Sequence, residues 1–385
     1  MRRLPRFVLV LLVIEFVDEL VFGAEAAAWP LIRHDLGLDY SQIGLLLGLP
    51  VVVSGVVEPI LGILADTWQR RALILGGGVA FAVAAALVGG STSFIMLLAA
   101  MALFYPASGA FVSLSQATLM DVAPDRHEQN MARWTFAGSI GVTLGPLALG
   151  AAMAVGWGWR GLFWLFAALA AVAAGWLWRT PFPPPAAAET GQPQGFRAGL
   201  AGAVRSLRQR EVLRWLLLLQ FADLMLDVFF GYLALYFVDV AGVSPAQAGL
   251  AVLAWTSVGL TGDFLIIPAL ERVSGLAYLR LSAALVLILF PAFLLIPGWW
   301  AKLALVAALG LLNSGWYAIL QGRLYSAMPG RSGSAVAVGN LFGWFGALLP
   351  LAIGLTADRL GLGPALWLLL AAPIALLVGL PYNRA

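Results

Sequence analysis

Cysteine is absent from the 385-residue sequence, and charged residues make up only 11% of it. The first absence excludes disulfides and thiolate metal sites. The second sets the chain apart from soluble domains, in which about 25% of residues are charged. Hydrophobic residues account for 62% of the chain, so the composition indicates an integral membrane protein.

Apolar runs of about 20 residues recur along the whole chain, and a helix of that length crosses a hydrocarbon layer of roughly 30 Å. The first run follows three arginines, as the apolar run of a signal peptide follows basic residues, but its length, its acidic residues and the absence of a small-residue cleavage site argue against removal. The expected fold class is therefore an all-α polytopic membrane protein with twelve transmembrane helices. The predicted spans are 7–32, 41–65, 72–90, 94–120, 132–155, 161–178, 212–238, 246–268, 278–296, 300–325, 334–356 and 363–380.

Basic residues are distributed unevenly among the loops that join these spans. If the N-terminus is cytoplasmic, 18 of the 22 Lys and Arg residues lie on the cytoplasmic side. An excess of basic residues marks the cytoplasmic side of membrane proteins, so both termini are predicted to be cytoplasmic, in a bacterial inner (plasma) membrane. This asymmetry also accounts for the net charge of +3, and nucleic acid is not expected as a partner. The four basic residues left outside are Arg33, Arg160, Lys302 and Arg359.

A segment rich in proline, glycine and small polar residues, TPFPPPAAAETGQPQGFRAG at 180–199, separates two sets of six spans. Such a composition predicts a flexible linker. The expected domains are a six-helix bundle at 1–179, a cytoplasmic linker at 180–210 and a second six-helix bundle at 211–385.

The two halves superpose after a shift of 205 residues, without gaps. The shift places three carboxylates on carboxylates: Asp18 on Asp223, Glu58 on Asp263, and Asp66 on Glu271. Flanking residues coincide as well, among them Gln116 with Gln321, Gly138 with Gly343, and Gly141 with Gly346. So many coincidences at one offset predict an internal repeat, with the two copies related by an axis along the membrane normal.

Two short motifs carry a resemblance to a known family. After the second span, GILADTWQRR at 62–71 resembles the cytoplasmic loop signature of the major facilitator superfamily, with Gln69 where the family usually has glycine. In the fifth span, GSIGVTLGPLALG at 138–150 is similar to the glycine-proline motif of the family's antiporters, with Leu149 in place of one glycine. The chain thus resembles the proton-coupled drug and cation antiporters with twelve spans.

The resemblance implies two pseudo-symmetric bundles that rock around a central cavity and open it alternately to each side of the membrane. No cofactor is implied, and protons are the expected coupling ion of a monomer. Helix packing is the alternative role for the glycines, because small residues let two backbones approach closely. The residues to which the resemblance assigns gating are Gly62, Asp66, Arg70, Arg71, Gly145 and Pro146.

Four carboxylates interrupt the first span, in the stretch IEFVDELVFGAE at 14–25. At 100° per residue these acids lie along one side of a helix, as do Asp223 and Asp227 on the seventh span. A charge at mid-bilayer costs about 2.5–3.5 kcal/mol, so the acids must face protein or water. The resemblance to the superfamily places both helices on the central cavity, so we expect the two acidic stripes to face each other across a water-filled pathway.

Basic partners for these acids inside the membrane are scarce, and the only candidates are Arg323, near the inner end of the tenth span, and Lys302, near its outer end. Some acids are therefore expected to hold protons near neutrality, and others to bind a cation. Glu25 is expected in an outer vestibule. Further cavity candidates on the fourth and tenth spans are Tyr105, Ser113, Trp316 and Tyr317. The predicted substrate- and proton-binding residues are Asp18, Asp223, Glu15, Glu19, Asp227, Glu58, Asp263, Gln116, Asn313 and Gln321.

Proton-coupled export of an organic cation, or of cationic drugs, is the function that these features favour. A divalent cation of the Mg, Ca, Mn or Fe class is the alternative cargo, with Asp18 and Asp223 as ligands, because hard cations prefer oxygen. A polar metabolite or lipid is a third. An enzyme is not expected, because the only histidines, His34 and His127, are predicted in loops on opposite sides of the membrane and cannot share a triad or zinc site.

Overall fold

The computed structural model describes residues 6–67, 70–122, 127–182, 209–270, 272–327 and 332–381. Over these ranges the chain is helical with short turns and contains no strand. It divides into two compact units: unit 1 comprises residues 1–38 and 49–193, and unit 2 comprises residues 39–48 and 194–385. Most of the predicted linker lies outside the described residues.

Helices of unit 1, together with the first part of α2 that belongs to unit 2, follow one another in chain order. They are α1 (Arg6–Leu36), α2 (Tyr40–Thr67), α3 (Arg70–Gly90), α4 (Phe94–Ser108), η1 (Gly109–Ser113), α5 (Leu114–Val122), α6 (His127–Ala154) and α7 (Gly158–Arg179). Unit 2 continues with α9 (Arg210–Asp223), η3 (Leu224–Val228), α10 (Phe229–Asp239), α11 (Pro245–Leu270), α12 (Gly275–Leu295), α13 (Trp299–Asn313), α14 (Trp316–Ser326), α15 (Ser332–Leu360), α16 (Leu362–Ala365), η4 (Leu366–Leu370) and α17 (Ala371–Gly379).

These segments account for the twelve predicted spans. Four spans are irregular and consist of shorter pieces: α4-η1-α5, α9-η3-α10, α13-α14 and α16-η4-α17. Ten of the twelve are long and apolar enough, within the described residues, to cross a membrane. The predicted fold class is confirmed, but the placement of both histidines in loops is wrong. His34 lies in the last turn of α1 and His127 begins α6, because both helices extend beyond their apolar cores.

The internal repeat extends to the geometry of turns. The turns before α2 and α11 both contain a glycine with positive φ, 61° at Gly37 and 69° at Gly242. Each turn is followed by a capping box, in which a polar side chain and a glutamine three residues later bind each other's backbone N–H groups. The two boxes pair Asp39 with Gln42 and Ser244 with Gln247. All three positions in one turn lie 205 residues before their counterparts.

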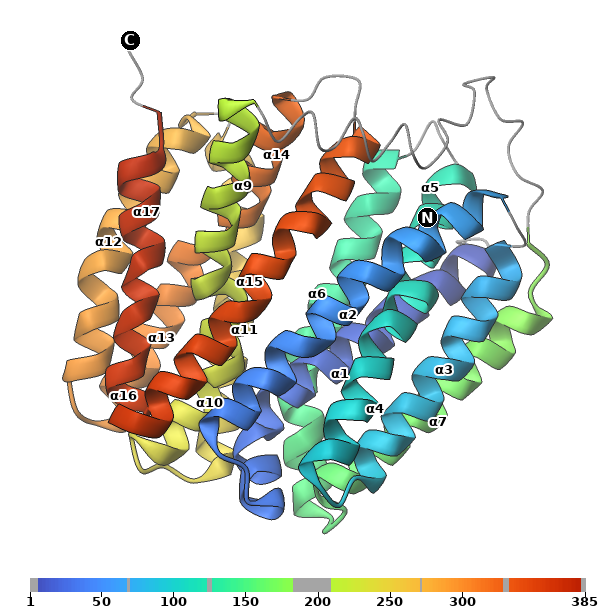
Figure 1. The fold of residues 1–385 in the computed structure, drawn as a ribbon, viewed down its shortest axis with the longest axis horizontal. Helices are drawn as coiled ribbons and strands as arrows, with labels where there is room; N and C mark the ends of the chain where they lie inside the picture. The colour runs from blue at the N-terminus through green and yellow to red at the C-terminus, as the bar shows by residue number, and fades with distance from the viewer. Residues whose placement is uncertain are drawn as a thin grey trace. The chain divides into compact units, whose positions relative to one another are not determined.

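Close backbone contact joins α1 to α6 within unit 1, where α3 likewise packs along α7 (Figure 1). The contact depends on the glycines of the antiporter-like motif. A Cβ atom at Gly141 would lie 2.5 Å from the carbonyl oxygen of Phe16, and one at Gly145 would collide with the backbone of Gly23 and Ala24. The motif therefore seats α6 directly against the helix that carries the four acids.

Candidate functional site

A cavity of about 190 Å³ lies within unit 1. Its walls come from α1, α2 and α4, and they combine four carboxylates with three aromatic side chains and one serine. Glu58 lies on the second span, and the structure brings it beside the acids of the first span. The lining residues are Asp18, Glu19, Phe22, Glu25, Glu58, Phe104, Tyr105 and Ser108.

Serine hydroxyls hold two of these carboxylates in position. Ser108 Oγ donates to Asp18 Oδ1 at 2.8 Å, and Ser54 Oγ donates to Glu58 Oε1 one helical turn away. In the described part of the chain, neither Asp18 nor Glu58 forms an ion pair with a basic residue. Among those residues, the hydrogen-bond partners of both acids are neutral hydroxyl groups.

The fourth span becomes π-helical directly after Ser108, over η1. Single π-helical turns inside α-helices often occur at functional sites. The first residue of η1 is Gly109, and a Cβ atom there would stand 2.6 Å from Glu58 Cγ. The glycine therefore makes the room that Glu58 occupies, and the π-helical turn begins directly after the serine that binds Asp18.

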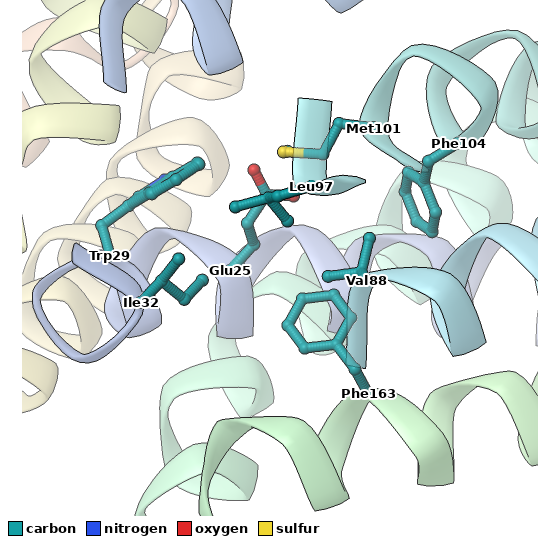
Figure 2. Close-up of a pocket in the computed structure, with 8 residues that line it drawn as sticks. All are labelled: Glu25, Trp29, Ile32, Val88, Leu97, Met101, Phe104 and Phe163. Carbon is teal, nitrogen blue, oxygen red and sulfur yellow. The ribbon is translucent and has the colours of Figure 1, made fainter. Parts of the chain in front are cut away.

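Glu25 lies between the main cavity and a smaller one of about 10 Å³ (Figure 2). Its carboxyl group stands among the side chains of Leu97, Met101, Phe104 and Phe163 in that view. Only 6% of Glu25 is exposed, and no described residue donates a hydrogen bond to it. The structure buries this residue instead of placing it in an outer vestibule, because α4 and α7 cover that side of α1.

Two further predicted residues of unit 1 do not line the cavity. Glu15 is 7% exposed and lies against α6, where a Cβ atom at Gly138 would stand 2.6 Å from Glu15 Oε1. Gln116 is half-buried on α5. Ser113, also proposed from the sequence, is exposed on η1.

The loop motif at 62–71 is described only in part. Its first half belongs to α2, but the side chains of Gly62 and Asp66 lie outside the described residues. Arg70 begins α3, and Arg71 donates a 2.6 Å hydrogen bond to the carbonyl oxygen of Trp178 near the end of α7. Arg71 therefore joins the start of α3 to the C-terminal end of α7, where a cation is favourable.

Unit 2 holds the acids related by the repeat. Asp223 accepts a hydrogen bond from Gln220 Nε2 at 3.3 Å, and the same amide's oxygen is buried without a donor. Asp227 lies on the π-helical segment η3 and is exposed. The seventh span is therefore irregular beside its acids, as the fourth span is beside Ser108. That the acidic stripes of the two units face each other stays a prediction.

The tenth span is interrupted between α13 and α14, at the positions that the repeat relates to η1. Asp263 accepts a hydrogen bond from the backbone N–H of Gly315 in this break, at 3.1 Å. Asn313, at the end of α13, is 2% exposed, and neither polar atom of its amide has a hydrogen-bond partner among the described residues. Gln321 is half-buried on α14.

Aromatic residues near the same break have different surroundings. Trp316 is fully buried and donates from Nε1 to Ser282 Oγ of α12 at 2.8 Å, so it packs one helix onto another. Tyr317 is 58% exposed. The break between α13 and α14 changes the helical phase. The direction of side chains after the break, Trp316 among them, therefore cannot be predicted from the residues before it.

Lys302 was a candidate counter-ion for the acids, but it serves a different purpose. It is 6% exposed, and its Nζ donates to Tyr236 Oη at 2.6 Å and to the carbonyl oxygen of Phe293 at 2.7 Å. The ammonium group also lies 5.0 Å from the centre of the Tyr236 ring. Lys302 therefore binds the C-terminal end of α12, whose last carbonyl groups lack helical donors.

Replacing Lys302 with methionine is expected to lower stability by about 1–3 kcal/mol, because buried acceptors lose their donor. Thermal unfolding of the purified protein in detergent measures the change. Lys302→Arg is the matched control, since it keeps the charge. An unchanged midpoint in the methionine variant would show that Lys302 contributes nothing to holding α12.

A duplicated six-helix unit with a carboxylate-lined cavity among membrane-spanning helices defines a membrane transporter rather than an enzyme. The particular family follows from sequence comparison. The family model of the Major Facilitator Superfamily matches residues 11–350, so the chain belongs to that superfamily. This confirms the resemblance drawn from its motifs.

Individual relatives and solved structures agree with this assignment. A protein of Streptomyces lividans named "Chloramphenicol resistance protein" is 29% identical over 364 residues, covering 92% of this chain and 90% of that protein. A bacterial homologue of the human lysosomal transporter Spinster has a similar fold, with a TM-score of 0.76 at 16% identity, over 97% of this chain and 93% of that one. The nucleoside transporter NupG gives a TM-score of 0.76 at 14% identity, over 98% of this chain and 100% of that one.

Proposed function

We propose that the protein exports small drug-like molecules, organic cations foremost, in exchange for protons. The observation that carries the proposal is the cavity of unit 1, which gathers Asp18, Glu19, Glu25 and Glu58. Three of these acids, Asp18, Glu25 and Glu58, have no basic partner among the described residues. A proton or a cationic cargo would supply the missing positive charge.

The exchange follows from the cost of burying charge. An ionised carboxylate within the membrane costs about 2.5–3.5 kcal/mol on insertion scales, so an empty cavity with several ionised acids is unfavourable. Protons neutralise the carboxylates in one state and a cationic cargo balances their charge in another, so protons and cargo compete for the same oxygen atoms. Alternating access then converts this competition into coupled transport in opposite directions.

The aromatic rings of the cavity suit the apolar part of such a cargo. Phe22, Phe104 and Tyr105 line the same space as the four acids. An aromatic face attracts a cation by about 0.5–2 kcal/mol, and it also packs against an uncharged ring. The cavity is therefore matched to a molecule with both an aromatic or aliphatic body and polar hydrogen-bond donors.

The relatives support drug export but leave the charge of the cargo to experiment. The Streptomyces lividans protein is named for resistance to chloramphenicol, which is an uncharged molecule at neutral pH. With an uncharged cargo, the acids would act on protons alone. The divalent-metal alternative has less support, since the described residues contain no group of three or more acids or histidines placed so that it could hold a metal ion.

We further propose a bacterial inner-membrane location with both termini in the cytoplasm, and action as a monomer. The distribution of basic residues supports the orientation.

Proton flux into proteoliposomes that enclose a pH-sensitive dye tests the function. We expect proton movement on addition of chloramphenicol or a lipophilic organic cation, and none on addition of Mg²⁺, Ca²⁺ or Mn²⁺. Liposomes without protein are the control. Flux driven by a metal ion would make the carboxylates metal ligands and would contradict drug export. Proton flux with chloramphenicol but not with the organic cation would mean that the acids bind protons and not the cargo.

A further inference from the structure

The first turn of α2 is capped by a residue more than 300 positions away. Asp358, near the end of α15, accepts hydrogen bonds from the backbone N–H groups of Tyr40 and Ser41, at 2.8 and 2.9 Å. Asp39 accepts from the next N–H, that of Gln42, at 2.7 Å. The first N–H groups of a helix have no partner within it, so two carboxylates supply what α2 lacks at its start.

Negative charge converges on the same helix end from another element. The hydroxyl of Tyr40 donates to Asp239 Oδ2, at the end of α10, at 2.9 Å. The N-terminus of a helix carries about half a positive charge, so Asp39, Asp239 and Asp358 all stabilise α2 in its present position. Among the described residues, the hydrogen bonds of Asp358 go to Tyr40 through Oδ1 and to Ser41 through Oδ2, so both oxygens of its carboxylate bind the start of α2.

Glycines let α2 and α15 touch backbone to backbone beneath this cap. A Cβ atom at Gly44 would lie 2.6 Å from the carbonyl oxygen of Pro350, and one at Gly48 would collide with that of Ala347. From the other helix, a Cβ atom at Gly354 would collide with the carbonyl oxygen of Tyr40. These contacts explain why residues 39–48 belong to unit 2, whereas α2 from residue 49 onward belongs to unit 1.

The capping contact has no counterpart in the internal repeat. The shift of 205 residues relates Asp358 to Met153, which has no carboxylate. It relates Tyr40 to Pro245, which has no backbone N–H to donate. The hydrogen bonds between Asp358 and the start of α2 are therefore not a consequence of the duplication.

We propose that Asp358 is a conformational latch that holds the start of α2 on α15 and releases it when the transporter opens at this end. The proposal rests on the alternating access of the proposed function. Since α2 is one continuous helix and its remainder belongs to unit 1, opening at this end must break both hydrogen bonds to Asp358. By the distribution of basic residues, this end is the one predicted to face outside.

Thiol labelling tests the latch directly, because the natural chain contains no cysteine. Leu47 is half-buried on α2 and would contact a Cβ atom at Gly231 of α10, so Leu47→Cys reports separation of the start of α2 from α10. In lipid nanodiscs, Asp358→Asn is expected to raise the rate of labelling by a membrane-impermeant maleimide by about tenfold, as for loss of a helix cap. Tyr40→Phe, which removes the hydroxyl group that donates to Asp239, is expected to raise it about threefold.

Asp35→Asn is the matched control. Asp35 lies near the same end on α1, but it accepts from Trp159 Nε1 at 3.1 Å and pairs with Arg160 at 3.3 Å, both within unit 1. Its loss should leave the labelling of Leu47→Cys unchanged. Equal rates in the Asp358→Asn and Asp35→Asn backgrounds, whether raised or not, would overturn the latch.

Labelling requires neither cargo nor a proton gradient, so it separates the latch from the proposed function. A rise with Asp358→Asn supports the latch even where no compound drives proton flux. Flux with an unchanged labelling rate would leave drug export standing and overturn the latch alone.

Discussion

Replacing Asp18 with asparagine is expected to abolish substrate-driven proton movement in proteoliposomes. Asparagine has nearly the same shape, and its oxygen still accepts from Ser108 Oγ, which donates to Asp18 at 2.8 Å. It can neither bind a proton nor balance the charge of a cation. The fold should therefore survive while coupling is lost, which dye-monitored flux and thermal unfolding of the same preparation measure together.

Asp35→Asn provides the control for this experiment, since it removes a carboxylate from the same helix outside the cavity. Asp35 is paired with Arg160 and its side chain is 48% exposed, so proton flux should persist at the level of the natural protein. Normal flux in a folded Asp18→Asn variant would exclude Asp18 from the coupling step. Glu25 and Glu58, which line the same cavity, would then be the next residues to replace.

Replacing Gly145 with alanine is expected to destabilise the protein by about 3 kcal/mol or more, at the upper end of overpacking effects. The added Cβ atom would collide with backbone atoms of Gly23 and Ala24 on α1, and a backbone cannot turn aside as a side chain does. The two helices would have to separate, and the cavity acids on α1 would move with them. We expect a lower thermal midpoint in detergent and loss of drug-driven flux.

Gly150 lies on the same helix and supplies the matched comparison. A Cβ atom there meets nothing within 4 Å, so Gly150→Ala should leave the midpoint unchanged or raise it, because alanine is the better helix former by about 1 kcal/mol. Equal midpoints in the two variants would show that contact between Gly145 and α1 does not contribute to stability.

The sequence pattern was sufficient to predict the membrane spans and the internal repeat, because both depend on the order of residues along the chain. The length of each apolar run predicted twelve spans, because a bilayer sets the length of the helix that crosses it. The shift of 205 residues predicted the repeat. The structure agrees at the turns, because Gly37 and Gly242, which the shift relates, both have a positive φ. Ser54, which donates to Glu58, lies four residues before it on the same helix, so this contact could be predicted from spacing alone.

Other features depend on where the helices lie beside one another. Ser108 meets Asp18 across 90 positions, and no spacing predicts that contact. Lys302 was one of two candidate basic partners for the acids, but it donates to the carbonyl oxygen of Phe293 near the end of α12. The π-helical turns at η1 and η3 shift the phase of the residues after them, so a wheel drawn at 100° per residue misplaces those side chains.

The sequence by itself determined that this is a helical, duplicated membrane transporter, because apolar length, charge asymmetry and the repeat are properties read along the chain. Only the tertiary structure decided which of the acids share a cavity and that Glu25 is buried among apolar side chains. It also decided that Asp358 caps α2. The physical reason is that an isolated carboxylate has no preferred partner. Its role depends on the hydroxyl, carbonyl or N–H group that another helix brings within hydrogen-bonding distance.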